Sequence, residues 1–303
     1  AETPGPVFSK LVPKQSTTSK ILYSIYFGLT VVETVLLKIA GMPWYDAVIH
    51  ALSSAGTGGF SNRNASVGAY GSVAIDLIIT VFILLFSVNF AVYFLLLTRK
   101  FRDILASDEL RFFLTVVAGS TLLIAWNIRG LYSSFAQALR YAVFQVASII
   151  STTGFATADF TLWPQLSHLI LILIMFCGAC AGSTGGGMKC SRILILGRSL
   201  RREIHRIVHP RSVEVVTLDG KVVEEETIHS ALTFVGSYFL VILAGALVIS
   251  LDNFSFSVSF SAALTCVSNV GPGLELIGPA GNFSIFSPLS KLVMSLCMIV
   301  GRL

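Results

Sequence analysis

The chain has 303 residues, of which 54% are hydrophobic and only 12% are charged. Soluble globular domains carry about 25% charged residues, so this composition excludes an ordinary soluble domain. The formal net charge is +5, but lysine and arginine gather in clusters, which fits the orientation of a membrane protein better than binding of nucleic acid. The composition therefore predicts an all-α, polytopic membrane protein.

Four segments are long and apolar enough to cross a bilayer core of about 30 Å. They are residues 18–41, 73–98, 109–128 and 228–251. Each is expected to form one spanning helix.

Shorter apolar segments alternate with these spans and end in turn-forming residues. Those at 44–55, 137–150 and 257–268 are too short to cross the bilayer, so they are expected to enter the membrane and return. A further apolar segment, 166–181, runs directly into the sequence GSTGGG.

Lysine and arginine cluster in three places. Such clusters concentrate on the cytoplasmic side of membrane proteins. The connections that contain the three short helices are therefore expected to lie on the opposite, outer side. The clusters are Lys10, Lys14 and Lys20; Arg99, Lys100, Arg102 and Arg111; and Arg192, Arg198, Arg201, Arg202, Arg206 and Arg211. The linker 213–224 alternates around Asp219-Gly220, which predicts a small cytoplasmic β-hairpin.

The short segments and the loops that follow them form an internal repeat. DAVIHALSSAGTGGFS (46–61) aligns with YAVFQVASIISTTGFA (141–156) and with VSFSAALTCVSNVGPG (258–273). Each copy has the order span, short helix, glycine loop, span.

These repeated loops predict a cation filter. Irregular backbone at membrane depth is tolerated only where it is buried in protein or lines a water-filled cavity. Glycine permits backbone angles that aim carbonyl groups at one axis, and such oxygens replace the hydration shell of a cation. One loop alone would be explained as an ordinary helix-ending turn, but three aligned copies favour the filter. The candidate filter residues are Thr57, Gly58, Gly59, Thr152, Thr153, Gly154, Asn269, Val270 and Gly271.

A second glycine-rich stretch, GACAGSTGGGMKCSR at 178–192, interrupts an apolar segment. Glycine costs about 1 kcal/mol relative to alanine inside a helix, so the helix is expected to break there. A flexible loop below a filter is a natural gate. A Walker phosphate loop is rejected because Met188 precedes Lys189 and Cys190 follows it. No combination of histidine, cysteine and carboxylates suggests catalysis.

The repeats, their GTGGF, STTGF and SNVGPG loops and the stretch CAGSTGGGMK resemble the superfamily of Trk, Ktr and HKT cation transporters. The chain is most similar to the membrane subunit of bacterial Trk potassium uptake systems. The resemblance implies potassium-channel-like units around a pseudo-fourfold pore, and hence four repeats. This chain then holds the second repeat (1–103), the third with a broken last span (104–212) and the fourth, truncated (225–303), while the first repeat is expected to be absent.

The resemblance also implies that the glycine-rich loop obstructs the pore beneath the filter, with Arg302 near the same constriction. A charge at mid-membrane costs roughly 2.5–3.5 kcal/mol on insertion scales, so it normally marks function. The alternative for Arg302 is a snorkelling residue at the end of a span. The implied gate residues are Gly182, Ser183, Thr184, Gly185, Gly186, Gly187, Lys189 and Arg302.

The function implied by the resemblance is uptake of potassium, the transported ion, across the bacterial cytoplasmic (inner) membrane, with the filter loops facing outside. No organic cofactor and no nucleic acid partner are expected. A homodimer in the lipid bilayer and a cytoplasmic ring of nucleotide-binding regulatory subunits are implied, with the basic stretch 192–211 and the following hairpin as candidate docking surfaces. A sodium-conducting or weakly selective member of the superfamily and a non-transporting membrane scaffold remain alternatives, and coupling to protons is left open.

Overall fold

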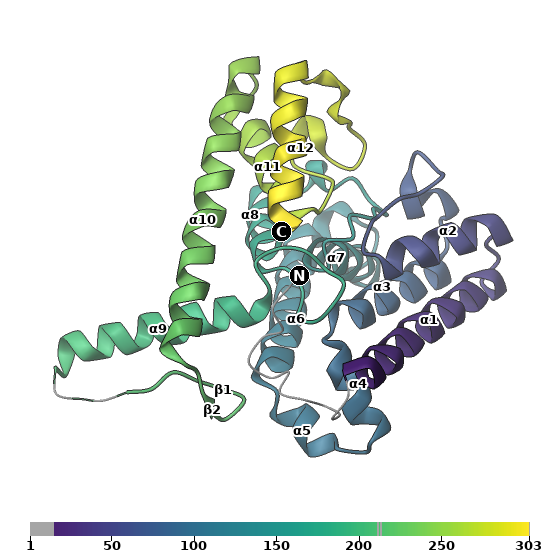
Figure 1. Ribbon diagram of the computed structural model, residues 1–303. Helices are drawn as coiled ribbons and strands as arrows, with labels where there is room; N and C mark the ends of the chain where they lie inside the picture. The colour runs from purple at the N-terminus through teal and green to yellow at the C-terminus, as the bar shows by residue number, and fades with distance from the viewer. Residues whose placement is uncertain (1–14, 211, 213, 303) are drawn as a thin grey trace.

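A computed structural model describes residues 15–210, 212 and 214–302 of the chain. Lys10, Lys14 and Arg211 of the basic clusters lie outside the described residues. The described part of the chain is mostly helical, with a two-stranded hairpin beside the helices (Figure 1). This confirms the predicted all-α architecture.

The α-helices are α1 (Gln15–Ile39), α2 (Trp44–Ala55), α3 (Val73–Ser87), α4 (Phe90–Leu97), α5 (Phe101–Ala106), α6 (Asp108–Ile128), α7 (Phe135–Ile150), α8 (Gln165–Cys177), α9 (Cys190–Val208), α10 (Glu225–Ile249), α11 (Phe256–Ser268) and α12 (Pro288–Arg302). The strands are β1 (Thr217–Leu218) and β2 (Lys221–Val222). Short 3₁₀ turns lie at Ser66–Tyr70, Arg129–Leu131, Phe160–Leu162, Ser250–Asp252, Glu275–Ile277 and Phe283–Ile285.

Three of the four predicted spans are confirmed as helices long and apolar enough to cross a membrane. They are Ser19–Ile39, Asp108–Leu131 and Glu225–Asp252. The antiparallel hairpin is also confirmed, with Thr217 paired with Val222 around the Asp219-Gly220 turn.

The fourth predicted span, 73–98, is wrong as a single helix. It breaks after Ser87, and α3 and α4 meet at an angle of 93°. Val88 is extended, and the Asn89 side chain accepts a hydrogen bond from Ala91 N at 2.8 Å, which caps α4. A capping asparagine inside an apolar run therefore restarts the helix in a new direction.

The three short segments form the short helices α2, α7 and α11, close to their predicted bounds. The apolar segment 166–181 becomes helix α8, which ends at Cys177, and helix α9 begins only at Cys190. The predicted break in this region is confirmed. Helix α9 then runs away from the helical body across the lower part of α10 (Figure 1).

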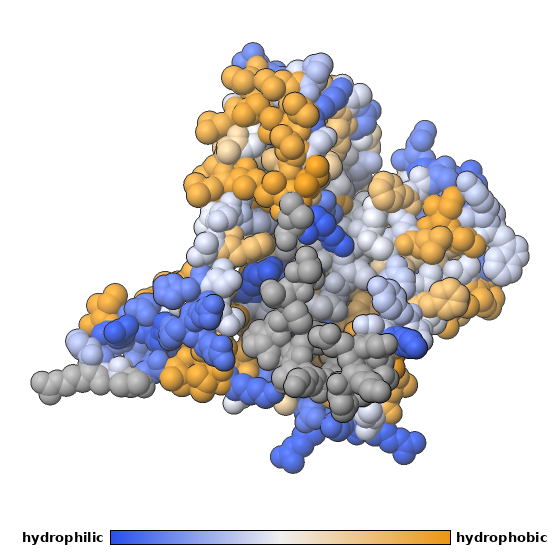
Figure 2. Space-filling model, viewed as in Figure 1, coloured by the Kyte–Doolittle hydropathy of each residue, from blue (hydrophilic) through white to orange (hydrophobic). Residues whose placement is uncertain are grey.

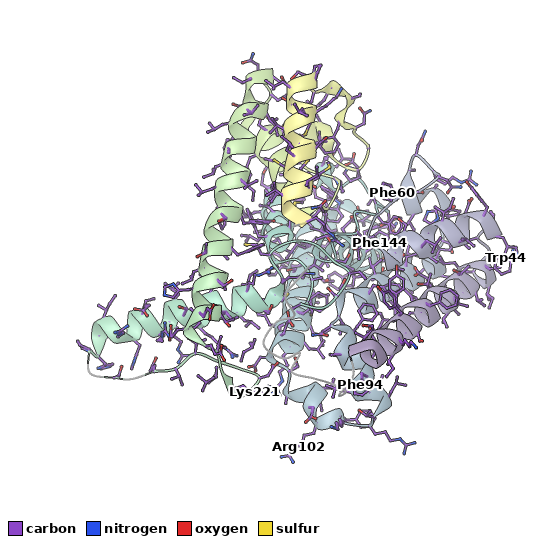
Figure 3. The ribbon with its side chains drawn as sticks, in the orientation of Figure 1. Trp44, Phe60, Phe94, Arg102, Phe144 and Lys221 are labelled. Atoms are coloured by element: carbon purple, nitrogen blue, oxygen red, sulfur yellow. The ribbon has the colours of Figure 1, made fainter. Side chains whose placement is uncertain are left out.

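The short helix α7 lies at the centre of the packing. Its Phe144 is fully buried in one apolar cluster with Ala47 of α2 and Ile79 of α3, and Figure 3 shows Phe144 within the body. A larger cluster joins its other face to α6, α8, α10 and α11. A buried ion pair, Arg140 Nε to Asp76 Oδ2 at 3.4 Å, also links α7 to α3.

The surface is divided between apolar and charged regions. Exposed apolar residues cover α10 and α12, while hydrophilic residues gather over α9 and over α5 at the lower end (Figure 2). Arg102 and Lys221 lie at this lower end, and Phe60 lies in the opposite half of the molecule (Figure 3). The polar lower end contains Arg102 of the second basic cluster and Lys221 of the hairpin.

The break between α3 and α4 gives a first prediction. Replacing Asn89 with alanine removes the cap of α4, which is expected to lower the free energy of unfolding by about 1 kcal/mol. Thermal unfolding of the purified protein in detergent measures the change. Asn64→Ala is the matched control because Asn64 is exposed in the loop before the Ser66–Tyr70 turn, and a loss no larger than in this control would contradict the capping role.

Candidate functional site: filter loops and gate loop

The three short helices end in the same hydrogen-bonded turn. After α2, Thr57 N donates to Ser54 O at 3.0 Å and Gly58 N donates to Ser53 O at 2.8 Å. This pair of bonds is the Schellman motif, which satisfies carbonyl groups that a helix end leaves free. The equivalent bonds join Thr152 to Ile149 and Thr153 to Ser148 after α7, and Asn269 to Cys266 and Val270 to Thr265 after α11. The three aligned sequences thus share one backbone turn.

The residue at the left-handed position of each turn is unusual. Glycine is the common residue there, but these turns use Thr57 (φ 48°), Thr152 (φ 59°) and Asn269 (φ 57°). A β-branched residue with positive φ is a genuine outlier, because its side chain crowds the backbone. The two threonines are therefore held in a strained conformation of the kind that clusters at functional sites.

The three loops pack against one another in chain order. A Cβ atom on Gly59 would lie 1.9 Å from Thr153 O, and one on Gly154 would lie 2.1 Å from Val270 O. These contacts leave no room for a side chain at either glycine. Gly59 (φ 66°) and Gly154 (φ 85°) also have positive φ, which glycine adopts without strain. The structure brings the predicted filter residues of all three repeats together.

The glycine-rich loop between α8 and α9, residues 178–189, lies directly beneath these turns. Thr184 O accepts a hydrogen bond from Thr57 Oγ1 at 3.0 Å, and Gly186 N donates to Thr152 Oγ1 at 2.6 Å. A Cβ atom on Gly186 would lie 2.6 Å from Ser268 O, at the end of α11. Three successive residues, 184 to 186, therefore contact the ends of all three short helices.

Two cationic side chains bind carbonyl groups of the same loop. Arg302 Nη2 donates to Thr184 O at 3.2 Å from the end of α12, and buried Lys189 donates to Gly185 O through Nζ. The C-terminal end of α12 lies near the centre of the molecule in Figure 1. The structure thus places Lys189 and Arg302, both predicted from the sequence, against the loop.

The start of the loop is also tied to the break between α3 and α4. Cys180 N donates to Ser87 O at 3.0 Å, Thr184 N donates to Phe86 O at 3.4 Å, and Phe90 N donates to Gly182 O at 3.2 Å. The two irregular segments, one from each of two spans, therefore supply hydrogen bonds to each other.

Two further carboxylates organise the site. Glu109 of α6 is buried and accepts hydrogen bonds from both sides of the glycine-rich loop. Glu109 was not predicted from the sequence, because a glutamate in the first turn of a helix resembles an ordinary helix-dipole partner. The second carboxylate is Asp46, in the first turn of α2.

Asp46 proves to be the centre of a hydrogen-bonded network behind the first filter loop. It accepts from Tyr70 Oη at 2.6 Å, from Asn62 Nδ2 at 2.5 Å and from Arg63 Nη2 at 3.0 Å. The hydrogen bonds from Tyr70, Asn62 and Arg63 lower the pKa of Asp46 from 3.8 to about 2. The network fixes the chain that leaves the filter loop after Gly59.

Comparison with known proteins agrees with this geometry. A family model described as a cation transport protein, TrkH, matches residues 8–303. The chain belongs to the TrkH family of cation transport proteins. The resemblance drawn from its loops is thereby confirmed.

Several relatives match the whole chain. The Trk system potassium uptake protein TrkH of Salmonella typhimurium is 37% identical over 312 residues, covering 100% of this chain and 63% of the relative. TrkG of Escherichia coli is 32% identical over 308 residues, with the same coverage. The chain therefore spans 63% of the length of these relatives.

A solved structure shows the same fold. The crystal structure of the potassium transporter TrkH from Vibrio parahaemolyticus superposes with a TM-score of 0.87 at 32% identity, covering 97% of this chain and 64% of that chain. As a TrkH-family protein with several spanning helices, the chain is a multi-pass membrane protein.

The Asp46 network predicts an acid-dependent stability. Because its pKa is lower in the folded protein, the stabilisation by Asp46 is complete above pH 3.8 and is lost as the pH falls toward about 2. Asp46→Asn is expected to lower the melting temperature at neutral pH, and the difference from the original protein should narrow in acid. Melting curves between about pH 6 and pH 3 test this. Exposed Asp103, replaced by asparagine, serves as control, and a difference that does not change with pH would contradict the assignment.

Proposed function

We propose that the chain forms part of a potassium uptake pore in which potassium, the transported ion, follows its electrochemical gradient through a gated filter. The relatives are described as Trk system potassium uptake proteins, which supports potassium as the ion. The observation that carries the proposal is the contact of residues 184–186 with all three filter loops. This arrangement is the one a gate beneath a filter requires.

The filter is proposed to use the carbonyl groups of the three turns. Each turn follows the C-terminal end of a short helix, which carries a partial negative charge that favours a cation. Glycine at the third position lets neighbouring loops approach closely, so their carbonyl groups can surround an ion. The three loops form three sides of a pore whose fourth side belongs to the first repeat of the family.

The glycine-rich loop is proposed as the gate because residues 184–186 contact all three turns of the proposed filter. Arg302 and Lys189 place positive charge on this loop, which opposes the passage of a cation. Opening must move residues 184–186 away from the three turns. The loop residues Gly182–Gly187 therefore set the closed state.

The site is proposed to face outward at the filter and inward at the gate, in the bacterial inner membrane. A homodimer and a cytoplasmic nucleotide-binding regulatory ring are proposed as partners, with α9, the hairpin and their basic residues as the docking surface. No catalytic or cofactor role is proposed. The rival function, a sodium-conducting or weakly selective transporter, is kept because selectivity also depends on the first repeat.

Uptake of cations into vesicles that contain the full-length protein tests the function. Potassium and rubidium are expected to enter well ahead of sodium and lithium. Equal fluxes of potassium and sodium would favour the weakly selective transporter. The absence of flux, even with the cytoplasmic partner added, would favour the non-transporting scaffold.

Substitution in the filter gives a sharper prediction. Gly154→Ser is expected to reduce the preference for potassium over sodium, because its Cβ atom would lie 2.1 Å from Val270 O and must displace that loop. The ratio of rubidium to sodium uptake measures the effect. Gly130→Ser is the matched control, since a Cβ atom there would meet nothing within 4 Å beyond its own chain neighbours. An unchanged ratio in Gly154→Ser would remove Gly154 from the filter.

Shortening the gate loop tests the second half of the proposal. Deletion of residues 183–187 removes the contacts with Thr57 and Thr152 and is expected to raise the leak of rubidium into vesicles. The filter residues remain, so the preference for potassium should persist. A leak equal to that of the unmodified protein would show that the loop does not close the pore.

A further inference from the structure

Glu109 stands in contact with both sides of the glycine-rich loop. It lies in the first turn of α6 and is only 8% exposed. Its Oε1 atom accepts a hydrogen bond from Ala181 N at 2.7 Å and another from Ser191 N at 3.0 Å. These donors lie just before Gly182 and in the first turn of α9, so one oxygen atom joins the two sides of the loop.

The donors themselves explain why a carboxylate is suited to this position. Ser191 belongs to the first turn of α9, where backbone N–H groups have no partner within the helix. The N-terminal end of a helix also carries a partial positive charge, which a carboxylate complements. Hydrogen bonds to an ionised acceptor are roughly twice as strong as neutral ones. A glutamate can therefore hold both chain segments with one oxygen.

We infer that Glu109 is a positioning residue that clamps the gate loop in its closed state, an inference that rests on the proposed gate. Cys190 N donates to Ala179 O at 3.0 Å beside the clamp, so the chain enters and leaves the loop at the same point. Residues 182–187 then form a loop under the proposed filter, and its two ends are held together at Glu109. Any opening that separates the two sides must break the bonds to Glu109.

The neighbouring residue anchors the clamp to the cytoplasmic hairpin. Asp108 Oδ2 accepts from Arg198 Nη1 of α9 at 2.9 Å and from Asp219 N at 2.9 Å. Asp108 N in turn donates to Asp219 Oδ1 at 2.6 Å. Asp219 forms the turn between β1 and β2, so a displacement of the hairpin pulls on the helix end that carries Glu109. The clamp therefore lies between the hairpin and the gate.

The test measures rubidium leak into vesicles that contain the full-length protein. Glu109→Ala removes both hydrogen bonds and is expected to raise the leak at least about tenfold, since the loss of even one hydrogen bond to a charged group changes the ratio of open to closed states by about that factor. Glu109→Gln keeps an acceptor oxygen but loses the charge, so a smaller increase is expected. Asp103→Asn removes a negative charge from the exposed surface of α5 nearby and should leave the leak unchanged.

Two comparisons separate a clamp from a general structural role. The ratio of rubidium to sodium uptake should stay unchanged in the Glu109 variants, because the filter is intact. Adding Glu109→Ala to the deletion of 183–187 should raise the leak no further, because the clamp then has no loop to hold. An increase of the same size in the deleted protein would assign Glu109 a structural role and overturn the inference.

The two proposals fail in different ways. If the deletion of 183–187 leaves the leak unchanged, the gate itself is wrong. If the deletion raises the leak while Glu109→Gln and a folded Glu109→Ala do not, the gate stands and the clamp is overturned. Should Glu109→Ala fail to assemble, Glu109→Gln decides the question, since a leak equal to that of Asp103→Asn contradicts the clamp.

Discussion

The need to give every backbone polar group a partner away from water governs this structure. In a bilayer core only helices satisfy their own N–H and C=O groups, so each break in a helix must be matched by a partner elsewhere. Among the described residues, such breaks interrupt the chain between α3 and α4 and between α8 and α9. The hydrogen bonds from Cys180 N to Ser87 O and from Phe90 N to Gly182 O show that each break supplies hydrogen-bond partners to the other. Each irregular segment therefore satisfies backbone groups that the other leaves without a helical partner.

This pairing explains which parts of the fold the sequence could predict. Three spans, three short helices and the hairpin follow from local apolar length and turn residues, and those predictions hold. The break after Ser87 does not follow, because the run Val73–Leu97 is almost wholly apolar and contains one capping asparagine. Its cause is partly distant in the sequence, since Gly182 O accepts the hydrogen bond of Phe90 N. Local sequence patterns cannot reveal a hydrogen-bond partner that lies 92 residues away in the chain.

The candidate site also contains some residues that could be predicted from the sequence and others that could not. The glycine loops after the three short helices were predictable because they recur, and the break between α8 and α9 was predictable because the five glycines of residues 178–187 disfavour a continuous helix. Glu109 was not predictable, because its two partners, Ala181 and Ser191, are backbone groups far along the chain. The strain at Thr57 and Thr152 was also hidden, since threonine gives no sign in the sequence that it will adopt a positive φ.

The strained threonines connect the proposed filter to the proposed gate loop. Glycine would fit the left-handed position without strain, but it has no side chain to reach the loop below. Thr57 Oγ1 donates to Thr184 O and Thr152 Oγ1 accepts from Gly186 N, so the two β-branched residues are the ones that bind the gate loop. Asn269, which tolerates positive φ better, directs its amide to Met298 O of α12 instead. If the proposed gate loop moves away, both threonines stay strained and lose these hydrogen bonds, so the conformations of the proposed filter and gate would be linked in free energy.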